Sequence, residues 1–407
     1  MKAVVFKSVG DIRVEDVPEP TIQDATDAII RITASSICGT DLHMVRGTMP
    51  GMKAGTILGH EAVGIVESVG VQVTNFSVGD RVVVCSTIAC GACRFCQCGE
   101  FSSCDNANPN GPDAGTAFFG GPASTGPING LQAERARIPF ADTTLVRLSD
   151  SISDEDALLT SDIFPTGFMA AEFADINAGD SVAVFGCGPV GQMAIASAKL
   201  LGASEIFAVD CIPERLKLAQ HQGAVPIDYA SVDPVKTLKG YTNEVGPDAC
   251  IDAVGVDAQS APSGPAKADL QAKLLNTIDQ RIVAPHAVPF GDQWRQGDAP
   301  TQVLRWCTEA VRKVGRISIV GVYPPQVQLY PIGGALEKSL TIRGANCSHR
   351  RYVERLLKLI EQGAFKPSQV LAQQKSLTAA VDCYKNFDHR QEGWFKVELL
   401  PGTEAAA

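Results

Sequence analysis

Short apolar runs, each ended by a turn residue, fill the first 150 residues of the chain. Because these runs are rich in Val and Ile, they predict β-strands at residues 2–7, 27–34, 62–69 and 81–85. Glycines at positions 55, 59, 70 and 79 bound the strands. Such a series predicts an all-β, partly barrel-like domain. Residues 105–130 are rich in Gly, Pro and Asn, which predicts a long surface loop.

The pattern changes after residue 150, where apolar runs alternate with stretches of helical spacing. Strands are predicted at residues 181–185, 205–209, 249–253, 316–320 and 339–343, and helices at residues 190–201, 213–222 and 352–361. Alternation of this kind indicates a parallel sheet with helices on both faces. Residues 256–300 interrupt it as a polar, Pro-containing insertion around one helical piece at 266–278.

Composition and charge narrow the class of protein. A chain of 407 residues with 45% hydrophobic and 20% charged residues is typical of a globular protein of two large domains. No run of about 18 apolar residues occurs, and charge and proline break up the first residues, so neither a membrane span nor a signal peptide is expected. A formal net charge of −10 disfavours nucleic acid as a partner. We therefore expect a soluble, cytoplasmic protein.

Five of the 13 cysteines lie within 15 residues, and four of these have the form C-x2-C-x2-C-x7-C. A quartet of thiolates can close a tetrahedral shell around Zn²⁺, and a closed shell has a structural role. An iron–sulfur cluster or a set of free thiols is the alternative. Cys98 could compete as a ligand, but its spacing favours a bystander. The predicted ligands are Cys90, Cys93, Cys96 and Cys104.

A second candidate metal site lies earlier in the chain. Cys38 stands in C-G-T-D-x-H and His60 in G-H-E-x-x-G. Cysteine, histidine and one further ligand would leave a zinc ion with an open position, which Lewis-acid catalysis requires. Taken alone, each residue could instead be a buried cysteine or a core histidine.

A dinucleotide motif follows the strand predicted at 181–185. Gly186 permits a tight turn, Gly188 lets the backbone approach a pyrophosphate, and Gly191 lets the helix pack on the strand. Pro189 and Val190 open this helix, whose positive N-terminus suits phosphates. Asp210, 19 residues after Gly191, would accept the ribose hydroxyls, which favours NAD over NADP. Arg215 is counter-evidence, since it could bind a 2′-phosphate, or it could be a solvated helix charge.

Along the chain, the motifs follow in the order C-G-T-D-x-H, G-H-E-x-x-G, C-x2-C-x2-C-x7-C and G-x-G-x-x-G. With these motifs in this order, the chain resembles the zinc-dependent medium-chain alcohol dehydrogenases, and the resemblance covers nearly its whole length. It implies a GroES-like, mostly-β catalytic domain at residues 1–154 and 346–407. It also implies a doubly wound, parallel-sheet Rossmann domain at residues 155–345, with the insertion at about 256–300. The overall fold class is therefore α/β.

The third zinc ligand is implied by the resemblance and not by spacing. The family places it where this chain reads S-D-x-x-P-T-G. That version is similar to the glutathione-independent formaldehyde dehydrogenase branch, which uses aspartate, so Asp162 is the implied ligand. A helix N-cap is the alternative for Asp162, because a Ser-Asp pair before a helix is ordinary capping chemistry.

The resemblance also implies roles for several other residues. Thr40 and His43 would relay the alcohol proton, although His43 could be an exposed loop histidine. Glu61 would ligate zinc transiently, but we expect a buried acid paired with an arginine. His349, with Arg350 and Arg351, is expected in a solvated first turn of the last long helix, or else at a cofactor phosphate. The residues implied against the cofactor are Thr166, Val254, Val320 and Val322.

The sequence therefore predicts a zinc-dependent oxidoreductase that transfers a hydride between an alcohol or aldehyde hydrate and NAD, with one catalytic and one structural zinc per chain. An aldehyde dismutase with retained NAD and a non-catalytic, zinc-stabilised NAD-binding module are the alternatives. The expected partners are a small-molecule substrate and further copies of the chain, in a homodimer or homotetramer.

Overall fold

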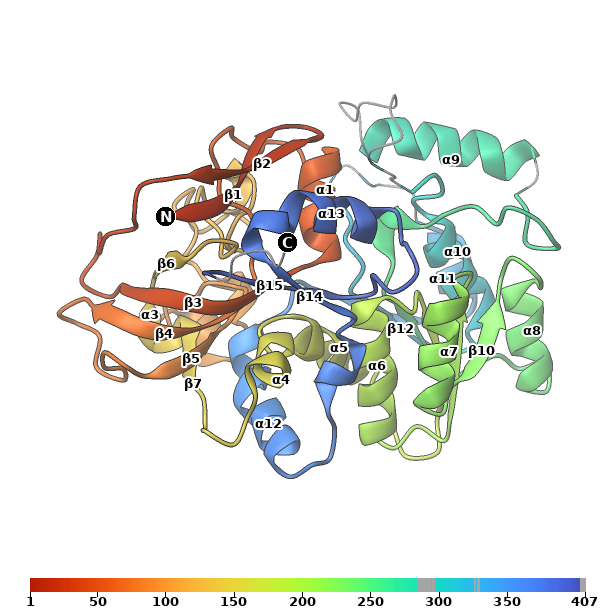
Figure 1. The fold of residues 1–407 in the computed structure, drawn as a ribbon. Coiled ribbons are helices and arrows are strands. Elements are labelled where there is room, and N and C mark those ends of the chain that lie inside the picture. Colours follow the sequence, from red (N-terminus) through yellow and green to blue (C-terminus); the bar gives the residue numbers. More distant parts are fainter. Residues whose placement is uncertain (269, 284–293, 295–296, 326, 328–329, 403–407) are drawn as a thin grey trace. The chain divides into compact units, whose positions relative to one another are not determined.

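The computed structural model describes residues 1–402 apart from 269, 284–293, 295–296, 326 and 328–329 (Figure 1). The chain divides into two compact units. The first comprises Met1–Pro165 and Asn346–Ala407, together with Trp294, and the second comprises Thr166–Pro285 and Gln296–Ala345. Among the described residues, none of the helices is both long enough and apolar enough to span a bilayer.

A mostly antiparallel seven-stranded sheet organises the first unit, with the order β14-β15-β3-β4-β5-β7, and β6 pairs with β3. The strands are β3 (Ala28–Ile37), β4 (Ala62–Val69), β5 (Arg81–Val84), β6 (Arg135–Ile138), β7 (Leu145–Arg147), β14 (Gln373–Ser376) and β15 (Val397–Leu400). A separate hairpin joins β1 (Lys2–Ser8) to β2 (Asp11–Asp16). The predicted strands are therefore confirmed, and a mostly-β unit is formed.

The register of β3 and β4 brings distant residues together. Ser35 of β3 lies opposite Ala62 of β4 in an antiparallel pair. The end of β3 and the start of β4 consequently lie at the same end of the sheet. Cys38 follows β3 directly and His60 shortly precedes β4, so both residues lie at this end.

Helices and 3₁₀ turns of the first unit fill the connections between strands. The α-helices are α1 (Gly39–Arg46), α2 (Arg94–Gln97), α3 (Ala141–Thr144), α4 (Asp154–Leu159), α12 (His349–Glu361) and α13 (Ala380–Asp388). The 3₁₀ turns are η1 (Phe101–Ser103), η2 (Ala123–Thr125), η4 (Pro367–Val370) and η5 (Leu377–Ala379). In α12, Val353 and Leu357 are buried one turn apart, as the predicted spacing requires.

The segment 105–130 is mostly irregular, as predicted, but it is not simply a surface loop. Phe119 is fully buried, and Ala107 and Ala117 pack with it in the core of the first unit. The composition of the segment correctly predicted that it is mostly irregular. Its few apolar residues explain why parts of it are buried.

A six-stranded parallel sheet forms the second unit, in the order β10-β9-β8-β11-β12-β13. Its strands are β8 (Ser181–Phe185), β9 (Glu205–Asp210), β10 (Val225–Asp228), β11 (Ala249–Asp252), β12 (Arg316–Ile319) and β13 (Thr341–Gly344). The helices around it are α5 (Ile163–Phe173), α6 (Pro189–Leu200), α7 (Pro213–His221), α8 (Pro234–Tyr241), α10 (Gln302–Ala310) and α11 (Ile332–Glu337). The strand order reverses between β8 and β11, which is where doubly wound sheets bind their ligands.

Alternate residues of the strands face opposite helical layers. Val182 and Val184 of β8 pack in the cluster that includes α5, α6 and α7. Ala183 and Phe185 pack in the cluster that includes α8 and α10. Because successive strand side chains point to opposite faces, both faces are apolar and covered, so the predicted doubly wound arrangement is confirmed.

The insertion at 256–300 contains η3 (Gly255–Asp257) and one helix, α9 (Leu270–Val283), which begins and ends four to five residues later than the helix predicted at 266–278. Buried Asp279 of α9 accepts a hydrogen bond of 2.6 Å from Thr301 Oγ1. Trp294 packs in a core cluster of the first unit, where its Nε1 donates to the Gly10 carbonyl at 2.8 Å.

Candidate functional site

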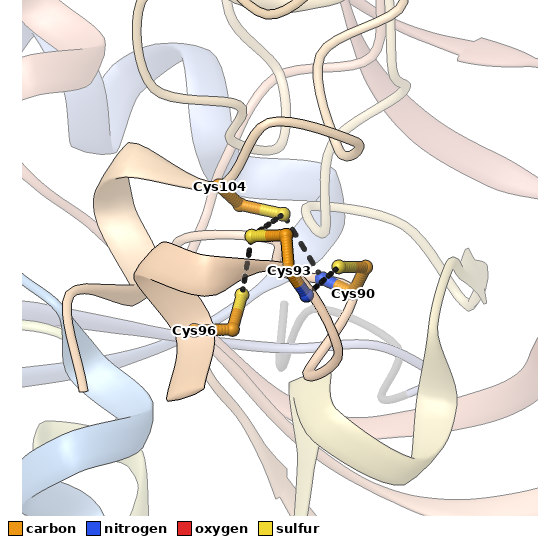
Figure 2. Close-up of side chains that lie close together, drawn as sticks. All are labelled: Cys90, Cys93, Cys96 and Cys104. Carbon is orange, nitrogen blue, oxygen red and sulfur yellow. Dashed lines mark hydrogen bonds between the residues drawn. The ribbon is translucent and has the colours of Figure 1, made fainter. Parts of the chain in front are cut away.

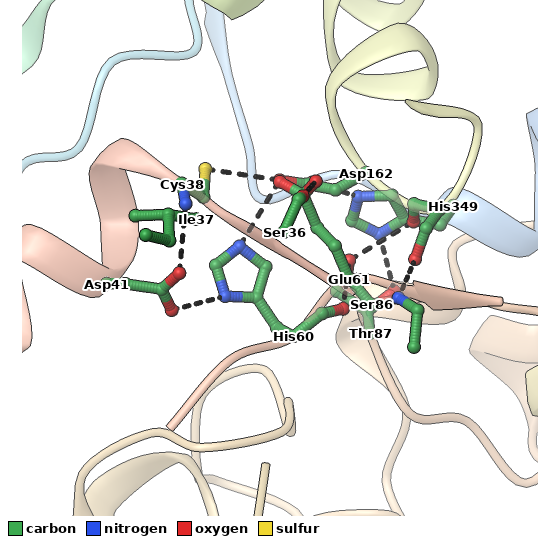
Figure 3. Close-up of polar contacts among 12 residues, drawn as sticks. Ser36, Ile37, Cys38, Asp41, His60, Glu61, Ser86, Thr87, Asp162 and His349 are labelled. Carbon is green, nitrogen blue, oxygen red and sulfur yellow. Dashed lines mark hydrogen bonds and ion pairs between the residues drawn. The ribbon is translucent and has the colours of Figure 1, made fainter. Parts of the chain in front are cut away.

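Three side chains that the sequence analysis grouped as a metal site meet in the first unit (Figure 3). Asp162 Oδ2 lies 3.6 Å from Cys38 Sγ and 3.3 Å from His60 Nε2. Tetrahedral zinc with bond lengths of about 2.3 Å to sulfur and about 2.0 Å to nitrogen and oxygen would place these atoms about 3.5 and 3.3 Å apart. Both separations thus fit one tetrahedral ion, and Glu61 is a fourth residue with a possible ligand atom nearby.

The same three residues are electrostatically suited to a cation. Burial, with the negative charges of Glu61 and Asp162, raises the pKa of Cys38 to about 11. Burial alone would raise the pKa of Asp162 as well, but hydrogen bonds from His349 and His60 hold it well below its usual range. A divalent cation at the common point of these donors would offset the charge that raises the thiol pKa.

His60 is oriented by an acid from the first turn of α1. Its Nδ1 lies 3.0 Å from Asp41 Oδ1, and Asp41 Oδ2 accepts the Cys38 backbone N–H at 2.9 Å. Gln132 Nε2 also approaches Asp41, at 3.3 Å. A carboxylate at Nδ1 leaves Nε2 as the ligating nitrogen, which is the usual support for a metal-bound histidine. Asp41 stands in C-G-T-D, but its support of His60 was not predicted from that motif.

Glu61 is a buried, paired acid, as expected, but its partner is a lysine instead of the predicted arginine. Lys396 Nζ lies 2.7 and 2.8 Å from the two carboxylate oxygens of Glu61, and both side chains are 0% exposed. The ammonium also donates to the Ile37 carbonyl at 3.0 Å. Ser36 Oγ donates to Glu61 as well. The pair therefore holds Glu61 beside the candidate metal ligands.

His349 corrects the prediction of a solvated first turn. It is the first residue of α12, but its side chain is only 4% exposed, and Nε2 lies 2.6 Å from Asp162 Oδ1. Nδ1 lies 3.1 Å from Thr87 Oγ1. Burial would lower the pKa of His349, but the charge of Cys347 and the hydrogen bond with Asp162 outweigh it and raise the pKa to about 10. Arg351, in contrast, is exposed and near Glu100.

The two predicted relay residues both lie on α1. Thr40 is half-buried in the first turn. His43 is buried, so the alternative interpretation of His43 as an exposed loop histidine is wrong. Thr48 Oγ1 donates to the His43 carbonyl at 3.1 Å and lies 2.9 Å from His43 Nδ1. Since the hydroxyl proton points to the carbonyl, Nδ1–H donates to Oγ1 in the neutral ring, whose Nε2 can then accept a proton.

A phenylalanine lies against the candidate metal ligands. The Phe118 ring is half-buried and meets the His60 ring edge-on, at 6.4 Å between centroids. Phe119 instead packs in the core. Of the two aromatic residues in this segment, Phe118 is the one able to contact a substrate bound near His60.

The cysteine quartet also converges, around α2 and η1 (Figure 2). Cys93 Sγ lies 3.5 Å from Cys96 Sγ and 3.9 Å from Cys104 Sγ. Tetrahedral zinc with bonds of about 2.3 Å would separate its sulfurs by about 3.8 Å. Backbone hydrogen bonds outweigh burial and lower the pKa of Cys93 to about 7, which favours a thiolate. Cys98 is exposed and outside this group, as expected.

The glycine motif of the second unit has the predicted tight geometry. Gly186 has a φ of 85°, in the left-handed region that favours glycine. A Cβ on Gly191 would lie 1.8 Å from the Gly186 carbonyl oxygen, so no larger residue fits there. Gly188 is the N-cap of α6, with Pro189 in its first turn and Val190 next to it. The backbone of this loop is therefore open to the close approach of a pyrophosphate.

Asp210 ends β9 and holds this loop. Its Oδ2 accepts the Cys187 N–H at 2.8 Å, and its Oδ1 accepts the Cys211 and Ile212 N–H groups at 2.7 and 3.0 Å. Arg215 NH1 lies 3.7 Å from Oδ2, so the cation pairs with the acid and is not simply a solvated charge. A carboxylate at this position suits ribose hydroxyls and repels an added phosphate.

The remaining predicted cofactor residues lie at the carboxyl ends of strands or on a helix. Val254 follows β11, and its Cγ2 would lie 2.3 Å from a Cβ on Gly186. Val320 N–H donates to the Asp252 carbonyl at 3.0 Å, and Val322 lies two residues further on. Thr166 is half-buried on α5. Asp252 itself, which no sequence motif indicated, is a buried acid whose Oδ2 accepts from Tyr323 OH at 2.6 Å.

Two family models match the chain. The alcohol dehydrogenase GroES-like domain matches residues 24–150, and the zinc-binding dehydrogenase model matches residues 189–263. Each match lies in one of the two units, on the mostly-β unit and on the parallel sheet respectively.

Two of three similar proteins cover 98% of this chain, and the third covers 68%. The uncharacterized zinc-type alcohol dehydrogenase-like protein AdhB of Bacillus subtilis is 34% identical over 406 residues, which cover 98% of this chain and 100% of AdhB. A glutathione-independent formaldehyde dehydrogenase of Pseudomonas aeruginosa is 34% identical over 288 residues, covering 68% of this chain and 71% of that protein. The solved alcohol dehydrogenase TADH from Thermus sp. ATN1 superposes with a TM-score of 0.80 at 32% identity, covering 98% of this chain and 100% of TADH.

Proposed function

This chain belongs to the zinc-type medium-chain alcohol dehydrogenase family, and from that premise we propose that it oxidises an alcohol or aldehyde hydrate with NAD. The observation that carries the proposal is the meeting of Cys38, His60 and Asp162 at tetrahedral ligand distances. Three protein ligands around zinc leave one position for substrate, whereas a structural site is closed by four.

Cys38 Sγ, His60 Nε2 and Asp162 Oδ2 would hold the catalytic zinc, and the four clustered cysteines would hold a structural one. A catalytic zinc supplies Lewis-acid polarisation of a substrate oxygen. Asp41 orients His60 for this role through Nδ1, and Lys396 keeps the charge of Glu61 balanced beside it. Phe118 contributes an apolar wall next to His60.

The proton of the alcohol must leave through groups of this chain. The Thr40 hydroxyl can donate and accept at once, and neutral His43 has an accepting Nε2 while Nδ1–H is held by Thr48. These two residues would carry the proton away from the reacting oxygen. His43 is suited to the final step because an imidazole ring can accept a proton at one nitrogen while the other donates.

NAD would bind at the carboxyl edge of the parallel sheet. The loop Gly186–Gly191 and the N-terminus of α6 would receive the pyrophosphate, and Asp210 the ribose. Thr166, Val254, Val320 and Val322 would contact the cofactor further along, and Arg215 would lie beside the adenosine. Bound NAD supplies the ring that accepts the hydride.

A substrate screen tests the proposal. Zinc-loaded protein is mixed with short and long, primary and secondary alcohols and with aldehydes, with NAD, with NADP or with no added cofactor, and NADH formation and product are measured. We expect turnover that needs NAD and is much slower with NADP. The absence of turnover with every substrate would leave a non-catalytic NAD-binding module and contradict the proposal.

The same screen separates a second candidate, an aldehyde dismutase that retains its NAD. The 34% identity to a glutathione-independent formaldehyde dehydrogenase supports this candidate, because the name of that relative gives an aldehyde as its substrate. A dismutase oxidises one aldehyde hydrate to the acid and reduces a second aldehyde to the alcohol, with no net change in NAD. Equal yields of acid and alcohol without added NAD would favour it.

We also propose that the protein is a homo-oligomer that associates through β13. This edge strand is exposed along its whole length, and the apolar side chains around it are exposed as well. Leu336 is 80%, Ile332 69% and Val314 67% exposed. An exposed edge strand with an apolar border is a template for pairing with a second chain.

Leu336→Asp tests this interface, because a charge there should lower the mass measured by light scattering toward that of one 43.0 kDa chain. Val71→Asp is the matched control, since Val71 is 94% exposed in the first unit, and its mass should equal that of the wild type. A monomeric wild type, or an unchanged mass in Leu336→Asp, would contradict the proposed interface.

A further inference from the structure

Aspartate at position 162 creates a requirement that a cysteine ligand would not have. A thiolate has one donor atom, whereas a carboxylate has two oxygens, and Asp162 is only 8% exposed, so its carboxylate is largely removed from water. Oδ2 faces Cys38 and His60, at 3.6 and 3.3 Å. A buried second oxygen needs its own hydrogen-bond donor, because an unsatisfied buried charge is costly.

His349 supplies this donor. A carboxylate can only accept, so the 2.6 Å contact has His349 Nε2–H donating to Asp162 Oδ1. We propose that His349 is a positioning residue for the catalytic metal, which holds Asp162 by Oδ1 so that Oδ2 alone is presented to the ion. This inference rests on the proposed zinc site and adds a residue to its support.

The ring of His349 is itself held on the far side, which a positioning role requires. Nδ1 lies 3.1 Å from Thr87 Oγ1, and Thr87 Oγ1 lies 3.1 Å from the Cys347 carbonyl oxygen, to which it donates. The preceding residue, Ser348, is fixed to η1 through Ser102, whose backbone N–H donates to Ser348 Oγ at 3.1 Å. Figure 3 shows Thr87, His349 and Asp162 in one line of contacts.

The arrangement predicts what happens when the donor is removed. Without Nε2–H, the Oδ1 oxygen of Asp162 loses this contact, and the carboxylate can turn so that both oxygens compete for one ion. Loss of a hydrogen bond to a metal ligand typically lowers metal affinity about 10- to 100-fold. The four-cysteine site does not involve His349 and should be unaffected.

The test compares zinc retention in His349→Leu and His349→Gln. Each purified protein is titrated with a competing chelator while the zinc content per chain and the far-ultraviolet circular dichroism are followed. We expect His349→Leu to lose one zinc at a chelator concentration about 10- to 100-fold lower than the wild type, and to keep the other. His349→Gln retains an N–H donor and should recover most of the affinity. His221→Leu, on an exposed histidine of α7, should behave as the wild type.

Cobalt substitution gives a second readout. The visible bands of cobalt(II) at the catalytic site report its coordination, so His349→Leu should change them while His349→Gln restores them. If His349→Leu does not fold, Thr87→Val carries the test, because it removes the partner of Nδ1 and should weaken zinc binding to a smaller degree. Unchanged zinc affinity and an unchanged cobalt spectrum in the folded variants would overturn the inference. A wild type that binds only one zinc would instead overturn the proposed function.

Discussion

Asp162→Ala is expected to lower turnover at least about a thousandfold, which corresponds to about 4 kcal/mol of transition-state stabilisation. The physical reason is the loss of the oxygen that lies 3.3 Å from His60 Nε2 and 3.6 Å from Cys38 Sγ, without which two ligands remain. Steady-state kinetics, zinc content and thermal unfolding are measured together. The variant should contain one zinc, carried by the cysteine quartet, and should remain folded.

Asp162→Cys is the chemical control for this prediction. A thiolate restores a third ligand, so this variant should bind the second zinc and recover part of the activity that the alanine variant loses. Wild-type turnover in Asp162→Ala would remove Asp162 from the ligand set and would leave helix capping as its role.

Lys396→Met is expected to lower the free energy of unfolding by about 3–5 kcal/mol, because it leaves the charge of Glu61 buried without its counter-ion. Both side chains are 0% exposed, and Nζ contacts both carboxylate oxygens of Glu61. Denaturant unfolding of the zinc-loaded protein measures the change. The double variant Glu61→Gln/Lys396→Met should recover most of the loss, since no unpaired charge remains.

Lys2→Met is the matched control, because the Lys2–Asp16 pair has the same 2.7 Å separation but is 46% and 74% exposed. An exposed pair contributes only about 0–1 kcal/mol, so this change should be small. A similarly small effect of Lys396→Met would show that the buried pair does not support the fold.

Residues close together in sequence were the most predictable. The strand at 62–69 and the strand at 181–185 have the predicted bounds, since alternating or continuous apolar runs follow from strand geometry. The quartet Cys90, Cys93, Cys96 and Cys104 also converges as its spacing implied. In these cases a short stretch of the sequence contains most of the information needed to predict the structure.

Partners that are distant in sequence could not be predicted from local pattern. Lys396 is 335 residues from Glu61, and His349 is 187 residues from Asp162. The first turn of α12 reads H-R-R, which by composition indicates solvent, but packing against η1 buries His349 while Arg351 stays exposed. An unpaired buried carboxylate is costly, so it was predictable that Glu61 pairs with a basic residue. Which basic residue it pairs with, a lysine instead of an arginine, was not predictable.

Zinc extraction during turnover shows whether one of the two proposed zinc ions is required for catalysis. The wild-type protein is treated with increasing chelator, and zinc per chain is measured in parallel with alcohol-dependent reduction of NAD. We expect two zinc ions per chain, with activity lost in step with one of them and regained when zinc is added back. Retention of full activity after all zinc outside the four-cysteine site has been removed would contradict it.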